Sequence, residues 1–424
     1  MTKDIILEKL YQKQNIFLTG GAGVGKTTLT REIIAAYLSE AKKVARLAST
    51  GMAATLLEGH TLHSFFDLGI CDSVEALEVR GKLNLKKKVK KLIQSMDIII
   101  IDEISMVSSE LLEMIRFRIL QAEFKGVLLV VGDFLQLPPV VRGSNEVHFA
   151  FESSSWDQFN FEVITLTKVH RTDDEDFIAV LDAVRFGEVN EAEHYYLHHL
   201  IQPLPEDLKE FTLLFGKNAS AHQHNIEQLA FIDEPTHSYE TQIVKHNKKI
   251  TDKEVERFLS DSRLEKTMQL KVGSPVLFTR NSWNYFNGER GEVVKLEPEA
   301  AYVLKKDSSG ESKVVKLERV AISKTSWQEK LNEVGKLEMQ EIGLITLHQF
   351  PLQLAFAITI HKSQGMSISD LVINTHEIFA PSQFYVALSR ATTPTRLIMM
   401  QPHVNWKHLA FVNEKAVKFV KDYS

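Results

Sequence analysis

The sequence predicts an α/β protein built on parallel sheets, and three observations support this prediction. A short apolar run at residues 16–18 leads into GGAGVGKT, a glycine-rich loop that opens a helix. Further apolar strands alternate with helical segments over the first 160 residues. The polar residues suited to chemistry follow the carboxyl ends of these strands, which is where parallel α/β sheets place their ligands.

The loop at residues 20–27 matches G-x-x-x-x-G-K-[ST] in the strand–loop–helix setting that this pattern requires. Its glycines let backbone N–H groups converge on a phosphate, and the helix N-terminus adds its positive dipole end. Lys26 is expected to reach the β- and γ-phosphates, and Thr27 to hold Mg²⁺. The strand, the spacing and the helix together disfavour a chance glycine-rich turn. The expected nucleotide contacts here are Gly20, Gly21, Ala22, Gly23, Val24, Gly25, Lys26, Thr27 and Thr28.

Composition limits the classes of protein that remain. A chain of 424 residues is too long for one core, so two to four domains are expected. The single cysteine excludes an intramolecular disulfide framework, and no apolar run is long enough to span a bilayer. We therefore expect a cytoplasmic protein that does not contact membranes. The formal net charge of −5 gives no global sign of nucleic-acid binding, although a local basic groove remains compatible with it.

A second chemical motif follows the buried strand at residues 97–101, which ends in Asp102 and Glu103. An apolar strand ending in this pair, downstream of a phosphate-binding loop, is the Walker B arrangement. Asp102 is expected to bind Mg²⁺, and Glu103 to orient and deprotonate the attacking water. The next strand, 127–131, ends in GDFLQLPPV, which places Gln136 to sense a γ-phosphate.

Three features of the chain admit two interpretations each. One of the adjacent Phe65 and Phe66 could face a ligand, or both could pack in the core. The lysine-rich helix at 85–94 is interpreted as a solvated face in preference to a DNA contact. Arg171 could serve catalysis, or it could pair with the acidic helix start that follows it.

The second half of the chain begins another α/β unit near residue 211 and then changes character. Residues 271–320 alternate apolar and polar positions with turn signals, which predicts short antiparallel strands in a small β-barrel. The aromatic residues there could contact a nucleic-acid strand, but barrel core is the favoured interpretation. They are Trp283, Tyr285 and Phe286.

Taken in order, these blocks resemble a superfamily-one DNA helicase of the Pif (petite integration frequency) group, a relative of RecD and of the phage Dda helicase. The resemblance spans residues 16–400 and includes ASTGMAA, TLHSFF, IDEISM, GDFLQLPPV, LTKVHRT, AITIHKSQGM and FYVALSRAT. It implies two RecA-like P-loop NTPase domains with ATP between them. The implied boundaries are 1–160 for the first domain, with a wedge insertion at 67–94; 161–279 and 344–424 for the second; and 280–343 for the inserted β-barrel.

The resemblance also assigns roles. Arg171 and Arg390 become arginine fingers, which favours the catalytic interpretation of Arg171. Gln364 and Gly365 join the nucleotide contacts, and Gln12 or Gln14 could read adenine. Single-stranded DNA is expected near Thr50, Gly51, His63, Phe65, Pro138, Thr359, His361 and Lys362.

The function implied is an ATP- and Mg²⁺-dependent helicase that moves 5′ to 3′ on single-stranded DNA and unwinds duplex or forked DNA. The expected protein is a minimal bacterial or phage-type helicase, a monomer or a dimer on DNA, in the general area of DNA repair, replication, recombination or telomere maintenance. The alternative is a DNA-stimulated ATPase that clamps or remodels complexes without unwinding. A P-loop kinase or GTPase is disfavoured because no acceptor-site or base-specificity motif is present.

Overall fold

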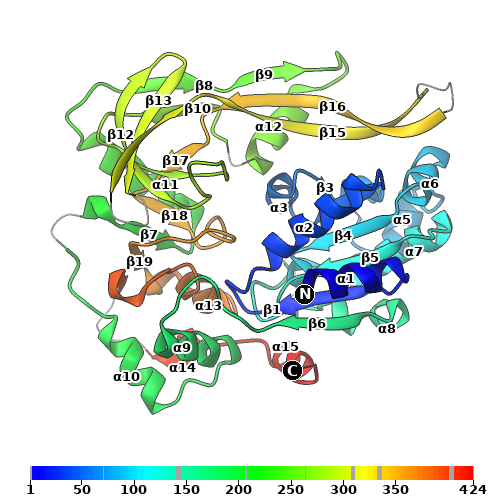
Figure 1. The fold of residues 1–424 in the computed structure, drawn as a ribbon, viewed down its shortest axis with the longest axis horizontal. Helices are drawn as coiled ribbons and strands as arrows, with labels where there is room; N and C mark the ends of the chain where they lie inside the picture. Colours follow the sequence, from blue (N-terminus) through cyan, green and yellow to red (C-terminus); the bar gives the residue numbers. More distant parts are fainter. Residues whose placement is uncertain are drawn as a thin grey trace.

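The computed structural model describes residues 2–69, 71–139, 146–205, 208–262, 264–306, 311–331, 337–400 and 405–423. Two parallel sheets with flanking helices form most of the body, and antiparallel strands lie along the upper side in Figure 1. No helix in these ranges is long and apolar enough to cross a membrane. The α/β class predicted from the sequence is therefore confirmed, with antiparallel sheets added to it.

The first sheet has six parallel strands in the order β3-β2-β4-β5-β1-β6. Its central strands read IIIID and VLLVV and are almost entirely buried, as expected for a parallel sheet with helices on both faces. The strands are β1 Ile16–Gly20, β2 Val44–Ala48, β3 His60–Thr61, β4 Ile98–Asp102, β5 Val127–Val131 and β6 Glu162–Leu166. The helices of this part are α1 Thr2–Tyr11, α2 Lys26–Ser39, α3 Gly51–Leu56, α4 Leu62–Phe65, α5 Val74–Val79, α6 Lys87–Gln94, α7 Ser109–Ala122 and α8 Ser154–Phe159, with 3-10 turns η1 Ile104–Met106 and η2 Ala150–Glu152.

Alternate side chains of these strands enter two different cores, because successive residues of a strand point to opposite faces. Ile99 and Ile101 belong to the core that includes α7, whereas Ile98 and Ile100 belong to the core beneath α1 and α2. Helices α5 and α6, in the expected wedge segment, pack against the first of these cores. The lysine-rich face of α6 forms ion pairs, with Lys90 2.5 Å from Glu123, which fits the solvated-face interpretation.

The second parallel sheet has four strands in the order β18-β7-β19-β20. Its strands come from distant parts of the sequence, because the antiparallel segment interrupts the chain between β7 and β18. They are β7 Thr212–Phe215, β18 Ala357–Thr359, β19 Leu371–Ile373 and β20 Leu397–Met399. The associated helices are α9 Glu175–Phe186, α10 Glu191–His199, α11 Asn218–Ala230, α13 Gln383–Leu388 and α14 Trp406–Leu409, with 3-10 turns η3 Leu208–Glu210, η4 Thr375–Glu377 and η5 Pro394–Arg396.

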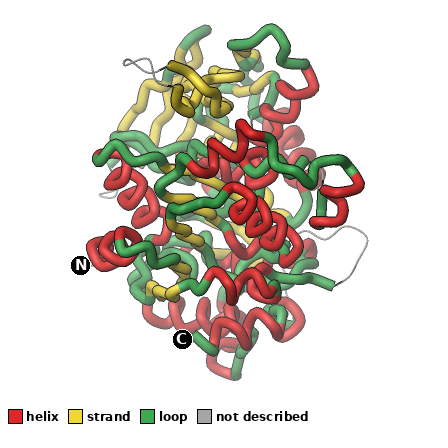
Figure 2. Tube along the Cα trace, turned by 90° about the vertical axis from the view of Figure 1, so that its right-hand side faces the viewer, coloured by secondary structure: helices red, strands yellow, loops and turns green. Residues whose placement is uncertain are grey.

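The antiparallel strands occupy a longer segment than the expected 280–343, because they run from β8 to β17. They form a five-stranded sheet, β14-β13-β12-β11-β17, a three-stranded sheet, β15-β16-β9, and the pair β10-β8. In Figure 2 these strands lie at the top of the molecule. Their grouping as one small barrel remains a prediction. The elements are β8 His237–Glu240, β9 Gln242–Lys245, α12 Asp252–Asp261, β10 Thr267–Leu270, β11 Pro275–Phe278, β12 Arg290–Glu297, β13 Ala300–Lys306, β14 Ser312–Leu317, β15 Val320–Leu331, β16 Leu337–Gln349 and β17 Leu352–Leu354.

The aromatic residues of the β11–β12 loop divide between core and surface. Tyr285 is buried and stacks on Phe278, so the expected core packing is confirmed at that position. Trp283 and Phe286 are 89% and 66% exposed, so the core interpretation is wrong for these two. Their exposure follows from their position in the loop, beyond the last paired residue of β11.

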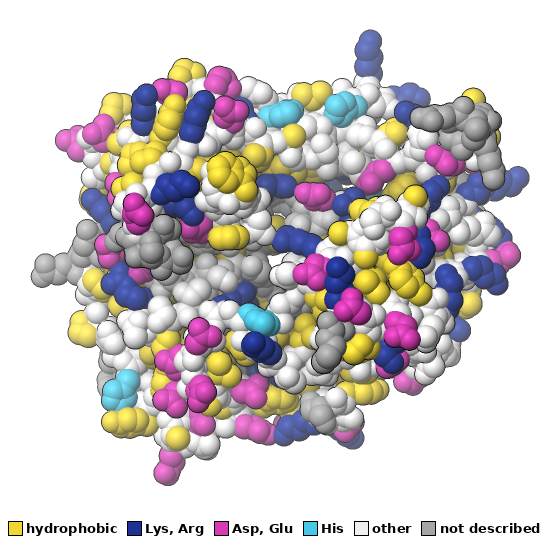
Figure 3. Space-filling model, in the orientation of Figure 1, with side chains coloured by type: hydrophobic (Ala, Val, Ile, Leu, Met, Phe, Trp, Pro, Cys, Tyr) yellow, Lys and Arg dark blue, Asp and Glu magenta, His cyan; other side chains and the backbone are white. Residues whose placement is uncertain are grey.

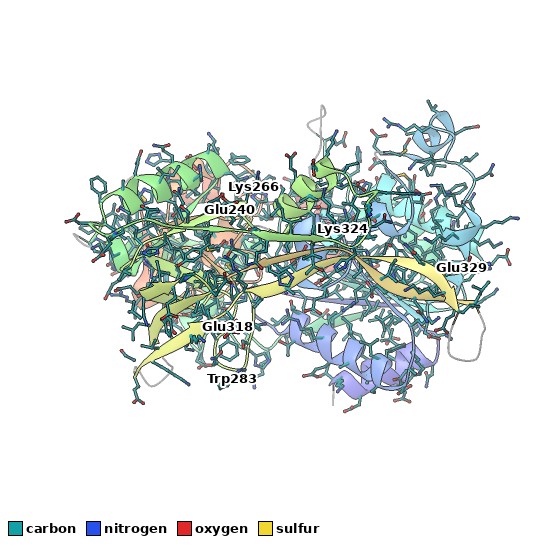
Figure 4. The ribbon with its side chains drawn as sticks, turned by 90° about the horizontal axis from the view of Figure 1, so that it is seen from above. Glu240, Lys266, Trp283, Glu318, Lys324 and Glu329 are labelled. Carbon is teal, nitrogen blue, oxygen red and sulfur yellow. The ribbon has the colours of Figure 1, made fainter. Side chains whose placement is uncertain are left out.

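The hairpin of β15 and β16 extends from the antiparallel region across to the first parallel sheet (Figures 1 and 4). Glu329, which Figure 4 labels near the far end of this hairpin, pairs with Lys91 of α6 at 2.6 Å. Glu341 of β16 accepts a hydrogen bond from His60 of β3 at 2.9 Å. The hairpin thus connects the inserted strands to the expected wedge segment.

The chain crosses between the two parallel-sheet regions more than once. Strand β6 lies beyond the expected boundary at residue 160, yet it pairs with β1 along its whole length. Helix α15, Glu414–Lys421, falls in the segment expected for the second domain, but Ala416 and Val420 are buried in the first core. Phe419 of this helix stacks on Phe151 with ring centroids 4.2 Å apart. The domain boundaries remain proposals, and these contacts favour placing β6 and α15 with the first sheet.

Candidate functional site: a phosphate-binding cleft between two parallel sheets

The phosphate-binding loop links β1 to α2 and has the backbone conformation that its glycines permit. Gly23 and Gly25 adopt positive φ angles of 78° and 88°, which other residues rarely adopt. Lys26, the first residue of α2, turns back and donates to the carbonyl oxygens of Gly20 and Gly21 at 2.7 Å each. Burial lowers the pKa of Lys26, so its ammonium group occupies a site that a bound anion would stabilise.

Asp102 and Glu103 lie at the carboxyl end of β4, as the sequence predicts. The Asp102 carboxylate accepts the backbone N–H of Glu103 at 2.9 Å, and Glu103 itself adopts the left-handed conformation with φ of 52°. Such a conformation is unfavourable for a residue with a side chain and is often retained at functional positions. Burial, and secondarily Asp102, raise the pKa of Glu103 to about 7, which suits a general base near neutral pH.

A cavity of about 1420 Å³ joins these residues to the second sheet. The wall from the first sheet includes the phosphate-binding loop, Asp102, Glu103 and Gln136. The opposite wall includes Gln364, Gly365 and Arg390, with Arg171 from the chain after β6. The structure therefore brings the predicted catalytic and nucleotide-contacting residues together around one cleft. Gly20 and Gly21 contribute through their bonds to Lys26 and do not line the cleft.

Arg390 is buried at this cleft and Arg171 is half-buried beside it, and the hydrogen bonds of both guanidinium groups go to neutral oxygen atoms. Arg171 donates to the Ser367 hydroxyl at 3.0 Å and to the carbonyl of Ser389. Arg390 donates to carbonyls that include that of Val386, at 2.9 Å. Burial lowers the pKa of Arg171 to about 10, and burial together with Arg171 lowers that of Arg390 to about 9. Two cations held together in this way favour an anion in the cleft.

The helix-pairing alternative for Arg171 is not supported. Helix α9 is capped by Asp174, whose carboxylate accepts the backbone N–H of Phe177 at 2.7 Å. The Arg171 guanidinium bonds instead to residues near Arg390. This placement agrees with the role that the family resemblance implies.

Thr27 and Asp102 offer oxygen donors that fit Mg²⁺, which commonly binds one or two protein oxygens together with phosphate and water. Both residues line the cleft. Bound there, Mg²⁺ would neutralise charge on the phosphate oxygens.

Sequence reasoning missed an ion pair that crosses this site. Arg185 of α9 donates from Nε and Nη2 to the two carboxylate oxygens of Asp133, at 3.1 and 3.0 Å. The hydroxyl oxygen of Tyr385, on α13, accepts the backbone N–H of Ala22 in the phosphate-binding loop at 2.7 Å. Asp133 could have been noticed because it begins the segment that contains Gln136. Nothing in the sequence around Arg185 indicates this contact.

A second cavity, of about 610 Å³, separates the first sheet region from α12 and β15. Gly51 and His63, two of the expected DNA contacts, line it, and Thr50 lines the nucleotide cleft beside it. The opposite wall brings three cations that the sequence analysis did not single out: Arg257, Arg280 and Lys324. Lys324 appears midway along the hairpin in Figure 4.

The remaining expected DNA contacts lie elsewhere. Phe65 is only 3% exposed and packs edge-on against Phe66 in the first core, so the prediction that it faces DNA is wrong in this structure. The apolar surroundings of α4 explain the burial of both rings. Pro138 is half-buried and lines neither cavity. Thr359 is the last residue of β18, and His361 and Lys362 follow it; all three lie outside the linings of both cavities.

The glutamines considered for adenine recognition also lie outside the cleft lining. Gln12 donates to Glu8 at 3.4 Å, and Gln14 donates to the carbonyl of Asn160 at 3.2 Å. Adenine recognition by either residue remains a prediction.

The fold and the cleft define a P-loop nucleotide hydrolase of the α/β class, with its site between two parallel sheets. Residues 3–195 match the family model described as PIF1-like helicase. An ATP-dependent DNA helicase Pif1 from Campylobacter jejuni is 38% identical over 411 residues, covering 92% of this chain and 90% of that protein. The chain belongs to the PIF1-like helicase family.

Solved structures agree with this assignment. A Bacteroides sp Pif1 in complex with ADP-AlF4 superposes with a TM-score of 0.84 at 27% identity, covering 99% of this chain and 96% of that one. A Bacteroides Pif1 bound to ssDNA gives a TM-score of 0.63 at 28% identity, with the same coverage. The arrangement of this chain is therefore closer to the first of these two structures.

Replacing Glu103 with Gln should preserve nucleotide binding and abolish most turnover, because the amide keeps the shape but cannot accept the proton from water. Lys26→Ala should nearly abolish hydrolysis without unfolding the protein, since Lys26 contacts backbone carbonyls at the cleft and no apolar core. Phosphate release, nucleotide binding and thermal unfolding should be measured beside Glu78→Gln, an exposed control. Full hydrolysis by the Glu103→Gln protein would contradict the role of this carboxylate.

Arg171→Lys should lower the single-turnover rate of ATP hydrolysis by roughly 10³- to 10⁵-fold, the contribution of an arginine finger in related phosphoryl transfer. An ammonium group cannot reproduce the planar donor fork of arginine, so we expect no rescue by the retained charge. Arg390→Lys should behave similarly, whereas Arg80→Lys, on an exposed side chain, should not. A near-normal rate for Arg171→Lys would show that this arginine has no catalytic contact.

Proposed function

We propose that this chain is an ATP-driven motor that moves 5′ to 3′ along single-stranded DNA and separates the duplex ahead of it. The observation that carries the proposal is the cleft itself, in which Lys26, Glu103 and Gln136 of one sheet region face Arg171 and Arg390. A site divided in this way couples nucleotide binding to the relative position of two sheets. Membership of the PIF1-like family identifies the chain as an ATP-dependent DNA helicase.

In the proposed reaction, the backbone N–H groups of the loop and Lys26 bind the phosphates, and Thr27 and Asp102 hold Mg²⁺. Glu103 accepts the proton of the attacking water, and Gln136 contacts the γ-phosphate. Arg171 and Arg390 stabilise the charge that develops during transfer. Their position beside each other supports this role, because the bound phosphate would relieve their mutual repulsion.

DNA binding is proposed along the strand ends that carry Thr50, Gly51 and His63 in one region and Thr359, His361 and Lys362 in the other. The cations at the second cavity support a groove there, although the net charge of the chain is −5. On the face drawn in Figure 3, basic and acidic side chains are interspersed, which agrees with local rather than long-range attraction of a polyanion. Single strands and forked DNA are the proposed substrates.

Unwinding of tailed duplexes tests the proposal directly. Duplexes with a 5′ single-stranded tail should be separated in the presence of ATP and Mg²⁺, and duplexes with a 3′ tail should not. The Lys26→Ala protein provides the matched control for contaminating activity. DNA-stimulated hydrolysis without strand separation on either substrate would favour a clamp or remodelling ATPase, and preference for the 3′ tail would overturn the assigned polarity.

Affinity for mixed-sequence single strands should depend only weakly on salt. For each phosphate that a cation neutralises, we expect log K to fall by about 0.7 per tenfold rise in salt concentration. The total slope should be shallow because hydroxyl and backbone N–H contacts release no counterions. A salt series by fluorescence anisotropy, with and without a non-hydrolysable ATP analogue, measures the slope. A slope that implies many neutralised phosphates, or affinity confined to one sequence, would contradict local contacts. Identical affinity with and without the analogue would contradict coupling between cleft and groove.

A further inference from the structure

A buried ion pair joins the two sheet regions directly behind the phosphate-binding loop. Asp133 follows β5 and is 1% exposed, and Arg185, near the end of α9, is 8% exposed. Arg185 Nε donates to Asp133 Oδ2 at 3.1 Å, and Nη2 donates to Oδ1 at 3.0 Å. Burial alone would raise the pKa of Asp133, but Arg185 holds it below its ordinary value, so the pair is ionised. A two-point contact of this kind fixes the orientation of the guanidinium group relative to the carboxylate as well as the distance between them.

On the first side, the pair fixes the turn that presents Gln136. The same Asp133 carboxylate accepts the backbone N–H of Leu135 at 3.1 Å, and the Asp133 carbonyl accepts that of Gln136 at 2.9 Å. The carboxylate that binds Arg185 is therefore also the group that shapes residues 133–136. A shift of this carboxylate would move Gln136 in the cleft.

On the second side, the pair fixes the helices beside Arg390. Helix α9, which carries Arg185, packs against α13, and α13 leads directly to Arg390. Tyr385 of α13 accepts the backbone N–H of Ala22, and its hydroxyl would lie 3.2 Å from a Cβ built on Gly21. Arg185 Nε would lie 3.8 Å from the same Cβ. The phosphate-binding loop is thus enclosed by side chains of α9 and α13.

We propose that Arg185 is a positioning residue for ATP hydrolysis. Through Asp133 it aligns Gln136 on one wall of the cleft with Arg390 on the other. It acts through other residues and not by contact with the nucleotide, since neither Arg185 nor Asp133 lines the cleft. This inference rests on the proposed function and adds to it the residue that fixes the position of Gln136 relative to Arg390.

A positioning role separates catalysis from nucleotide binding. Arg185→Lys keeps the positive charge but loses the two-point contact with the Asp133 carboxylate. We therefore expect kcat for ATP to fall by about 10- to 100-fold, the effect of displacing catalytic groups by about an ångström. KM for ATP, and the affinity for ADP, should stay within about threefold of wild type, because the phosphate ligands are retained. The additional affinity gained when AlF4 joins ADP should fall in parallel with kcat.

A second variant separates positioning from stability. In Asp133→Asn with Arg185→Gln, both charges of the pair are removed together, which avoids the large loss of stability that follows when one partner is left as an unpaired buried charge. We expect a melting temperature close to that of wild type, with kcat still reduced. Arg118→Lys is the matched control, since Arg118 is 1% exposed and bonds to the carbonyl of Leu83 and to Gln121, away from the cleft. This control should change the melting temperature but not kcat.

The outcomes are distinguishable. If the double variant restores both the melting temperature and kcat, the pair contributes only stability and the inference is wrong. If Arg185→Lys raises KM for ATP and weakens ADP binding without changing kcat, Arg185 acts on binding and the inference is also wrong. If wild-type protein itself neither hydrolyses ATP nor binds ADP more tightly with AlF4, the proposed function fails and this inference fails with it.

Discussion

The constraint on which the rest of this structure depends is the concentration of partly or fully buried cations at one cleft. Lys26 approaches it from the first sheet region, and Arg171 and Arg390 close it from the other side. The described hydrogen bonds of Lys26 go to backbone carbonyls, and burial lowers its pKa and those of both arginines. Desolvated positive charges are costly unless an anion accompanies them. A polyphosphate bound in the cleft would therefore be stabilised by all three cations.

The sequence was most informative where function needs a fixed local pattern. The loop before Lys26, the Asp102–Glu103 pair and Gln136 each follow a strand, so periodicity and motif together placed them at one sheet edge. Membership of a family placed Arg171 and Arg390, which residue patterns alone left ambiguous or unexplained. In each case the structure brings the residue to the cleft.

Contacts between distant segments could not be predicted in the same way. Phe65 lies beside His63 in sequence, but whether its ring faces a groove or the core depends on how α4 packs. The ion pair between Arg185 and Asp133 joins residues that are 52 positions apart and lie in different sheet regions, and no local sequence pattern predicts it. The extent of the antiparallel strands was underestimated because β8, β9 and β10 are only four residues long each, which is too short for a clear alternating pattern.

The return of α15 to the first core has a mechanical consequence. The polypeptide leaves the first sheet after β6 and comes back at α15, where Phe419 packs among Phe17, Phe134 and Trp156. The second sheet is therefore attached to the first at two separate covalent crossings. A change in the distance between the two sheets must therefore be accommodated by the chain at both crossings, which restricts how the cleft can open.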